Sequence, residues 1–280
     1  MAVLHGNLIY DVGMHLGEDT AFYLKKGFAV VGFEANPELV AQCSTRFAGA
    51  LADGRLQIVE GVIAPANNSE TITFYKNLYK SDWGTVDQSW ADRNTMRGSP
   101  SERIELPRID VIDAFNKFGI PHYLKTDVEE VDTHVIAALS EFDLRPRYVS
   151  IEAEVSDKSR FYLALSMLRD LGYSRFMLVQ QANIPGKVMR FKNVDGRELI
   201  HTFDKHASGP FGEDLDQPWT DFNATLHDFT DISRLTQLFG DRSRFSRLPK
   251  PVRKLAKLTY RLLTRRRGPL PGWYDLHATR

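Results

Sequence analysis

Residues 7–34 read NLIYDVGMHLGEDTAFYLKKGFAVVGFE, and this stretch predicts how the fold begins. The apolar run 7–12 predicts a strand, and the acidic residues after Gly17 suit the start of a helix. Gly27 is typical of a helix C-cap, and residues 29–33 predict a second strand that ends at Glu34. A strand, a helix and a strand in this spacing predict a parallel βαβ unit.

The same alternation continues to about residue 181, which predicts an α/β fold with a parallel sheet covered on both faces. Residues 76–104 and 183–250 lack clear periodicity and are predicted to be long loops. The predicted division is a core at 1–182, a loop-rich insertion or flap at 183–250, and a basic helix with a returning strand at 251–280. Further strands are predicted at 56–64, 123–128, 147–154 and 175–181, and further helices at 36–51, 131–142 and 159–173.

Composition indicates an ordinary globular chain of 280 residues, 42% hydrophobic and 26% charged. The single cysteine, Cys43, excludes an internal disulfide and fits a reducing compartment. No apolar run approaches the roughly 18 residues of a membrane-spanning helix, and no secretory signal is recognised at the start. These features predict a cytoplasmic protein, with contact at the membrane surface as an alternative.

The net charge of zero conceals an uneven distribution along the chain. Residues 242–267 hold eleven Lys and Arg and no Asp or Glu, which leaves 25 basic and 36 acidic side chains elsewhere, a net charge of −11. From Pro251 the sequence predicts a basic amphipathic helix. This helix could pack on the acidic body, contact an anionic membrane or bind a polyanion. A terminal strand at 273–278 would favour packing on the body.

The glycine turn after the first strand predicts a ligand site, because ligands of open α/β sheets bind beyond the carboxyl ends of the strands. Its spacing, Gly13-x-x-x-Gly17, differs from the dinucleotide fingerprint. Glu34 ends the next strand, where a carboxylate can hold a ribose diol of either NAD or S-adenosylmethionine (SAM). Asp11 favours SAM, since a carboxylate there would repel a pyrophosphate but could lie near an ammonium group.

Two stretches resemble the FkbM-type methyltransferases: YDVGMHLGEDTAFYLKKGFAVVGFEANPEL at 10–39 and YLKTDVEEVDTHVIAAL at 123–139. The second is similar to the family's Lys-x-Asp-x-Glu-Gly motif. SGPFGEDLDQPW at 208–219 and GWYDLHA at 272–278 resemble segments of one branch of the family, and the former is interpreted as a mobile acidic flap. The resemblance extends over about residues 7–180.

The resemblance implies a class I, Rossmann-like methyltransferase with a mostly parallel seven-stranded sheet, an antiparallel last strand and SAM as cofactor. It implies that Asp11, Gly13 and Gly17 line the methionine part and that Glu34 holds the ribose. By the same analogy Asn36 lies close to the adenosine. His15 stands where a small polar residue such as Asn is expected, so it is a further cofactor-site candidate, with a surface histidine as the alternative.

The motif YLKTDVEEVD at 123–132 places Lys125, Asp127 and Glu129 on one face of the predicted strand. Charges at the mouth of a central parallel strand indicate a site, because unpaired buried carboxylates are costly. We expect Asp127 to act as the general base or to orient a hydroxyl, with Glu129 beside it and Lys125 tuning both. The alternative is a Lys125–Asp127 ion pair that closes the sheet. Glu130 stands where the family motif has glycine, so a family member with impaired methyl transfer stays an alternative.

Several residues form a second group of candidates for contact with the acceptor. Tryptophan stacks on sugar faces, and carboxylates at a strand end can bind hydroxyl groups. A histidine on the helix after the motif could serve as an alternative base. No spacing is specific enough to predict a metal site, and a polar loop explains His201, Asp204 and His206. The acceptor-site candidates are Trp83, Glu152, Glu154 and His134.

These patterns predict a SAM-dependent O-methyltransferase acting on a hydroxyl of a sugar, a glycan or a small natural product. A nicotinamide oxidoreductase is weakened by the missing dinucleotide fingerprint. An RNA or other polyanion methyltransferase would use the basic tail, but the acidic body disfavours it. A protein that binds the cofactor without methyl transfer is the remaining alternative.

Overall fold

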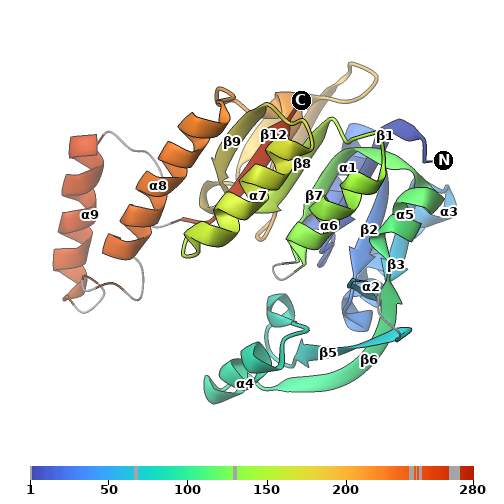
Figure 1. Cartoon of the computed structure of the whole chain (residues 1–280), viewed down its shortest axis with the longest axis horizontal. Coiled ribbons are helices and arrows are strands. Elements are labelled where there is room, and N and C mark those ends of the chain that lie inside the picture. The colour runs from blue at the N-terminus through green and yellow to red at the C-terminus, as the bar shows by residue number, and fades with distance from the viewer. Residues whose placement is uncertain are drawn as a thin grey trace. The chain divides into compact units, whose positions relative to one another are not determined.

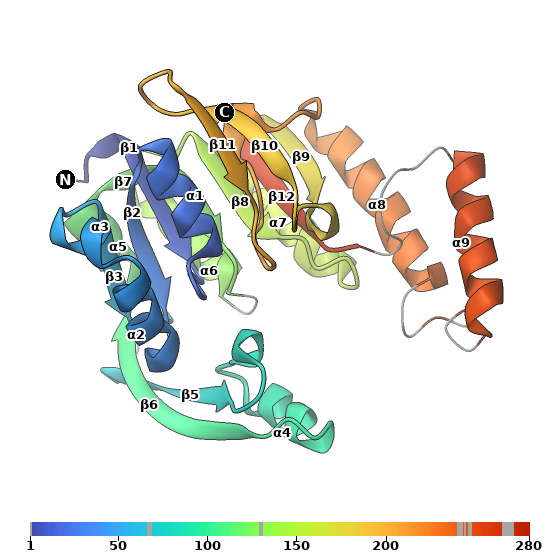
Figure 2. The same cartoon turned by 180° about the vertical axis from the view of Figure 1, so that it is seen from behind.

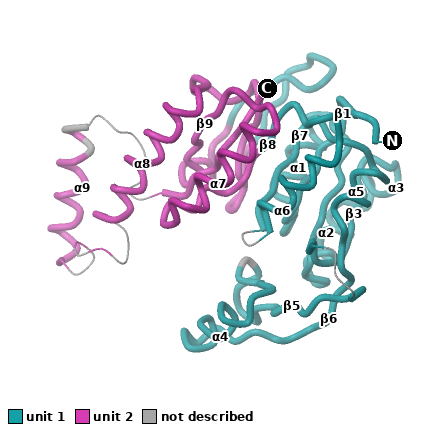
Figure 3. The backbone as a smooth tube through the Cα atoms, viewed as in Figure 1, with its two compact units in different colours: residues 1–149, 189–201 teal, residues 150–188, 202–280 magenta. Residues whose placement is uncertain are grey.

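The computed structural model describes residues 2–65, 69–128, 131–239, 243, 245, 248–264 and 272–280 (Figure 1). Glu129 and Glu130 lie outside the described residues. The chain divides into two compact units (Figure 3). Unit 1 comprises residues 1–149 and 189–201, and unit 2 comprises residues 150–188 and 202–280. The boundaries at 182 and 250 stay predictions.

The predicted βαβ opening is confirmed as β1 (Leu4–Val12), α1 (Glu18–Lys26) and β2 (Ala29–Glu34). β1 pairs in parallel with β2 and with β7 (Ile120–Thr126). Helices α1, α2 (Pro37–Arg46) and α3 (Ala48–Ala52) cover one face of these strands. Helices α5 (Val111–Phe118) and α6 (Asp132–Ala138) cover the other face, as Figures 1 and 2 show.

The main sheet has seven strands in the order β3-β2-β1-β7-β8-β12-β9, among them β3 (Leu56–Glu60) and β8 (Tyr148–Glu152). The final strand β12 (Tyr274–Thr279) runs antiparallel to β9 (Arg175–Gln180). The mostly parallel, class I arrangement predicted from the sequence is therefore confirmed, together with its antiparallel last strand. The return of residues 273–278 to a sheet is confirmed by the same pairing.

A small insertion in unit 1 stands between β3 and α5. It forms a three-stranded sheet in the order β4-β6-β5, with its own apolar cluster of Val62, Phe74 and Leu106. This insertion positions a short turn that reaches the glycine loop, described below. Its elements are β4 (Val62–Ile63), β5 (Thr71–Asn77), η1 (Ser81–Trp83), α4 (Gln88–Met96) and β6 (Ser101–Ile109).

Unit 2 contains two long helices besides α7 (Lys158–Asp170). Phe229 of α8 (Phe222–Phe239) stacks on Phe161 of α7, with ring centroids 3.5 Å apart. The predicted basic helix is observed as α9 (Lys250–Thr264). None of the helices in the described ranges is long and apolar enough to cross a membrane. Unit 2 also contains η3 (Gln181–Asn183) and η4 (Gly212–Asp214), whereas η2 (Leu139–Glu141) and almost all of β10 (Val188–Lys192) and β11 (Glu198–Thr202) belong to unit 1.

The predictions of long loops at 76–104 and 183–250 are wrong in part. The first segment contains α4, and the second contains the β10–β11 hairpin and the 18-residue α8. Phe229, Ile232 and Leu235 repeat at helical spacing and are buried, but polar residues between them weaken the signal. Ser208 and Phe211, at the start of the predicted flap, are buried, and its mobility stays a prediction.

His277 is a buried titratable group in the last strand. Neither ring nitrogen has a hydrogen-bond partner among the described residues, and burial lowers the pKa of this side chain to about 3. An unfolded histidine titrates near pH 6.5, so the unfolded state binds the proton first as the pH falls. His277 therefore costs folding stability below about pH 6.5 and increasingly down to about pH 3.

We predict that His277→Leu weakens the acid sensitivity of stability. At pH 5 the wild-type histidine should cost about 2 kcal/mol relative to pH 8, and the variant should lack this loss. Denaturant unfolding at both pH values measures the difference. His227→Gln, at an exposed position of α8, is the control and should keep the wild-type slope. An unchanged slope in His277→Leu would contradict the prediction.

Candidate functional site

The glycine turn joins β1 to α1 and is tied to the end of β7. Gly13 has a positive φ of 82°, and a Cβ atom there would collide with the backbone carbonyl of Asp127. The Asp127 N–H donates to the Val12 carbonyl at 2.9 Å, and the Gly13 N–H donates to the Phe33 carbonyl at 3.0 Å. Glycine is therefore required where the turn and the Asp127 segment meet.

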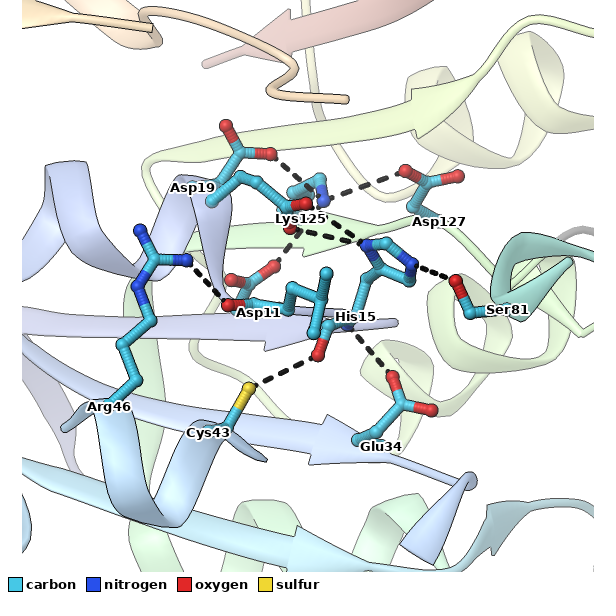
Figure 4. Close-up of polar contacts among 11 residues, drawn as sticks. Asp11, His15, Asp19, Glu34, Cys43, Arg46, Ser81, Lys125 and Asp127 are labelled. Carbon is cyan, nitrogen blue, oxygen red and sulfur yellow. Dashed lines mark hydrogen bonds and ion pairs between the residues drawn. The ribbon is translucent and has the colours of Figure 1, made fainter. Parts of the chain in front are cut away.

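A single ammonium group forms ion pairs with three carboxylates beneath and beside this turn (Figure 4). Lys125 Nζ lies 3.1 Å from Asp19 Oδ2, 3.4 Å from Asp11 Oδ1 and 3.5 Å from Asp127 Oδ2. Asp11 also accepts a hydrogen bond from Thr20 Oγ1 at 2.6 Å. Asp11, Asp19 and Lys125 are buried, whereas the Asp127 side chain is 41% exposed. Asp127 is thus the member of this cluster that solvent or a ligand can reach.

The pKa shifts of Asp11 and Lys125 are consistent with the burial of these two side chains. Burial raises the pKa of Asp11 to about 6, although Lys125 and the bond from Thr20 oppose the rise. Burial alone would lower the pKa of Lys125, but Asp11, Asp19 and Asp127 together raise it well above its ordinary value. Lys125 therefore stays charged at neutral pH. The cluster holds a permanent cation inside the sheet.

Glu34 at the end of β2 organises the backbone around it. Its Oε2 accepts the His15 N–H and its Oε1 accepts the Asn36 N–H, both at 2.8 Å. Burial raises the pKa of Glu34, and these two backbone hydrogen bonds oppose the rise. Asn36 is buried and caps α2 by accepting the Glu38 N–H at 3.0 Å. The carboxylate therefore fixes the glycine turn to the start of α2.

His15 connects the turn to the small insertion. It has a φ of 52°, uncommon for a residue with a side chain. Its Nδ1 lies 3.1 Å from Glu18 Oε1, and its Nε2 lies 2.8 Å from Ser81 Oγ (Figure 4). The His15 carbonyl accepts the Cys43 thiol at 3.2 Å. The interpretation of His15 as a surface histidine is therefore incomplete, because it bridges two segments of unit 1.

The sequence profile of the Methyltransferase FkbM domain matches residues 11–175, more than half of the chain. The chain belongs to the FkbM methyltransferase family. It is accordingly a SAM-dependent methyltransferase with a methyl acceptor as its second substrate. The matched range contains the glycine turn, Glu34 and the Lys125 cluster, so the predicted family and cofactor are confirmed.

Solved structures with a similar arrangement have low sequence identity to this FkbM methyltransferase. The precorrin-6y C5,15-methyltransferase of Geobacter metallireducens GS-15 is 12% identical, with a TM-score of 0.36 over 71% of this chain and 76% of its own. A SAM-dependent methyltransferase of Geobacter sulfurreducens in complex with S-adenosyl-L-homocysteine is 11% identical, with a TM-score of 0.34 over 99% and 86%. No curated protein matches the chain. The family assignment does not depend on these likenesses.

The residues at the end of β2 fit a ribose of the cofactor. The Glu34 carboxylate accepts the His15 N–H on one oxygen and the Asn36 N–H on the other, and a carboxylate has further lone pairs that can accept from hydroxyl groups. Asp11 fits less directly, because it is fully buried and bonded to Thr20 and Lys125. In this FkbM methyltransferase Glu34 is thus only partly buried, whereas Asp11 is fully buried beneath the turn.

Each acceptor-site candidate has its own surroundings within its unit. Trp83 lies in the turn beside Ser81, and the Lys80 ammonium lies 3.4 Å from the centroid of its ring. Burial lowers the pKa of His134, which Asp110 opposes, and no member of the Lys125 cluster contributes to that shift. Glu154 accepts hydrogen bonds from the Ser156 hydroxyl and N–H in unit 2, where Glu152 ends β8.

In the described part of the chain, no three His, Cys, Asp or Glu side chains form a group that could hold a metal ion. His201 is instead buried against Phe22 of α1, with ring centroids 5.0 Å apart. Residues that the sequence did not single out as site residues are Asp19, Thr20 and Ser81. In sequence Asp19 is only one of the acidic residues that suit a helix start, Thr20 follows it, and nothing pairs Ser81 with His15.

We predict that Lys125→Met destabilises the FkbM methyltransferase by about 3–5 kcal/mol, because it leaves buried Asp11 and Asp19 uncompensated. The loss should be smaller at pH 5 than at pH 8, since the proton that Asp11 then binds removes one charge. Denaturant unfolding measures both effects. Exposed Lys187→Met is the control and should change stability little. An equal, small effect of both substitutions would contradict the structural role of Lys125.

Proposed function

We propose that this protein transfers a methyl group from SAM to a hydroxyl of a sugar, in a glycan or a small natural product. The observation that supports the proposal is the exposed Asp127 carboxylate, held at the carboxyl end of β7 by Lys125 and by the glycine turn. A carboxylate in this place can accept the proton of an attacking hydroxyl. Carboxylates around a neutralised lysine also suit a polyol better than an anionic acceptor.

Bound SAM supplies an electrophilic methyl group, whose S–C bond breaks as the O–C bond to the acceptor forms. Asp127 orients the acceptor hydroxyl and takes its proton, which then passes to solvent through the exposed side of the carboxylate. Lys125 is a positioning residue that fixes the Asp127 carboxylate while Asp11 and Asp19 hold the ammonium from below. Glu129 lies outside the described residues, and its role beside Asp127 stays a prediction.

In the proposed cofactor site, Glu34 accepts the two ribose hydroxyls and Asn36 lies toward the adenosine. Gly13 and Gly17 give the turn its close path past the methionine part, with φ values of 82° and 73°. Asp11 acts through Lys125 and Thr20 and not by direct contact, since its carboxylate is buried. This differs from the expectation that Asp11 lines the methionine part.

Two alternative functions differ from this proposal in the methyl acceptor. One has a polyanion as acceptor, and the other binds the cofactor without methyl transfer. A polyanion such as RNA would meet the carboxylates of the proposed site, which disfavours it. Cofactor binding without transfer rests on Glu130 in place of the family's glycine, a residue outside the described ranges. Trp83 and Lys80 flank the Ser81 turn, and a sugar ring that stacks on Trp83 would have to share the ring with the Lys80 ammonium.

The test is methyl transfer from labelled SAM to simple methyl glycosides of glucose, galactose, mannose and fucose, with product analysis by mass spectrometry. Transfer to a sugar oxygen supports the proposal. Transfer to RNA in preference to every glycoside would replace it by the polyanion alternative. Binding of S-adenosylhomocysteine (SAH) without transfer to any hydroxyl compound would favour the binding-only alternative.

We predict that Asp127→Asn lowers kcat by about 100-fold or more, because the amide cannot accept the hydroxyl proton. The affinity for SAH should change by less than about twofold, since Glu34 and the glycine turn remain in place. Steady-state kinetics and calorimetry separate the two effects. Asp113→Asn on the exposed side of α5 is the control and should retain full activity. Retained transfer by Asp127→Asn would remove this residue from the mechanism.

A further inference from the structure

Helix α9 uses one side to pack against α8 and exposes another apolar side. Ala256 and Tyr260 pack against Leu235 and Phe239, and the rings of Tyr260 and Phe239 are 5.4 Å apart. In Figures 1 and 2 α9 lies beside α8, with no other described element of unit 2 on its far side. The expected packing of the basic helix on its own chain therefore accounts for only part of its surface.

The exposed side is a mainly aliphatic stripe that also includes exposed Thr259. Leu255 and Leu262 are 64% and 72% exposed, and Val252 and Leu258 are also exposed. Since successive residues of a helix are about 100° apart, these four side chains fall within an arc of about 120°. Exposed large apolar residues are ordinary when scattered, but a stripe of them indicates a binding surface. We call these four residues the leucine stripe.

The flank of the leucine stripe is basic. Lys250, Arg253, Lys254 and Lys257 occupy the next arc of the same helix, and α9 contains no acidic residue. None of these four cations forms an ion pair with a carboxylate among the residues that the structure describes. The charge is thus available to an external anion, and it borders directly on aliphatic side chains.

We propose that α9 is a docking surface for an anionic lipid membrane. An interfacial helix places aliphatic side chains at the boundary of the headgroups and acyl chains, while flanking lysines meet the lipid phosphates. The leucine stripe with its basic flank has this composition in one helix. α9 lies parallel to the membrane surface in this arrangement, since no described helix can span it.

Two other partners fit the surface less well. A nucleic acid would be held by the lysines, but it would leave the aliphatic stripe without a role. A protein partner, including a second copy of this chain, would more often be bound through Trp, Tyr or Arg anchors than through Leu and Val. The membrane uses both features of α9 at once, so the observations favour it.

The test is flotation of the purified full chain with vesicles of phosphatidylcholine alone or of phosphatidylcholine mixed with anionic phosphatidylglycerol, whose negative surface attracts basic residues. Binding should require the anionic lipid and weaken at high salt. Leu255→Gln/Leu262→Gln should lower the partition coefficient roughly tenfold or more, because it removes two inserted side chains. Lys250→Gln/Lys254→Gln should lower it about fivefold for each charge removed.

Leu163→Gln is the matched control, because Leu163 is 52% exposed on α7, away from the stripe. Its partition should equal that of the wild type, and circular dichroism should show that every variant is folded. Absence of binding to anionic vesicles would overturn the proposal. So would unchanged binding by the Leu255/Leu262 variant, which would reduce the contact to charge alone. Dimerisation abolished by the same variant, without vesicle binding, would assign the stripe to a second copy.

Discussion

The proposed site depends on the ion pairs that the Lys125 ammonium forms with Asp11 and Asp19. The ammonium group is a buried cation among buried Asp11 and Asp19, and the fold tolerates these charges only because each has its partner. Asp11 comes from β1, Asp19 from the first turn of α1 and Lys125 from β7. The ion cluster therefore connects the three elements that surround the glycine turn. Asp127 extends it to the surface, where its carboxylate is 41% exposed.

The glycine turn and the proposed catalytic segment at Asp127 are in direct backbone contact. Gly13 lacks a side chain because the carbonyl of Asp127 occupies that space, and the Asp127 N–H bonds the strand that leads into the turn. A change in the turn would thus move the Asp127 carboxylate. His15 extends this coupling to the small insertion through Ser81, and Glu34 extends it to α2 through Asn36. Cofactor and acceptor would meet residues that the backbone holds together.

The sequence predicted the sheet better than the contacts within the site. Strands β1, β2 and β7 have apolar runs with turn residues at their ends, and such local patterns are legible without a structure. The motif around Lys125 correctly predicted charges at a strand mouth. The partner Asp19 was not predicted, because only the folding of α1 over β1 brings it within 3.1 Å of Lys125. Ser81 was missed for the same reason, being 66 residues from His15 along the chain.

Contacts between elements distant in sequence decide which apolar residues of α9 are covered. They also explain why periodicity does not predict α8. The apolar positions of α9 form one stripe in sequence, but Ala256 and Tyr260 are used by α8 while Leu255 and Leu262 are not. Periodicity gives the amphipathic face without showing what covers it. In α8 the buried residues are separated by Thr, Ser and Asp, so its pattern is weaker than its packing. Burial of polar residues such as Thr225 and Ser233 is decided by neighbours distant in sequence.

The most direct test of this account is a crystal structure of the protein with SAH. The account predicts that both ribose hydroxyls lie within about 3 Å of the Glu34 carboxylate oxygens, the distance of an ordinary hydrogen bond. It also predicts that the sulfur faces the side of the turn on which the Asp127 carboxylate is exposed, with Asp11 still bonded to Lys125. A ribose bound away from Glu34, or a sulfur that faces away from Asp127, would contradict it.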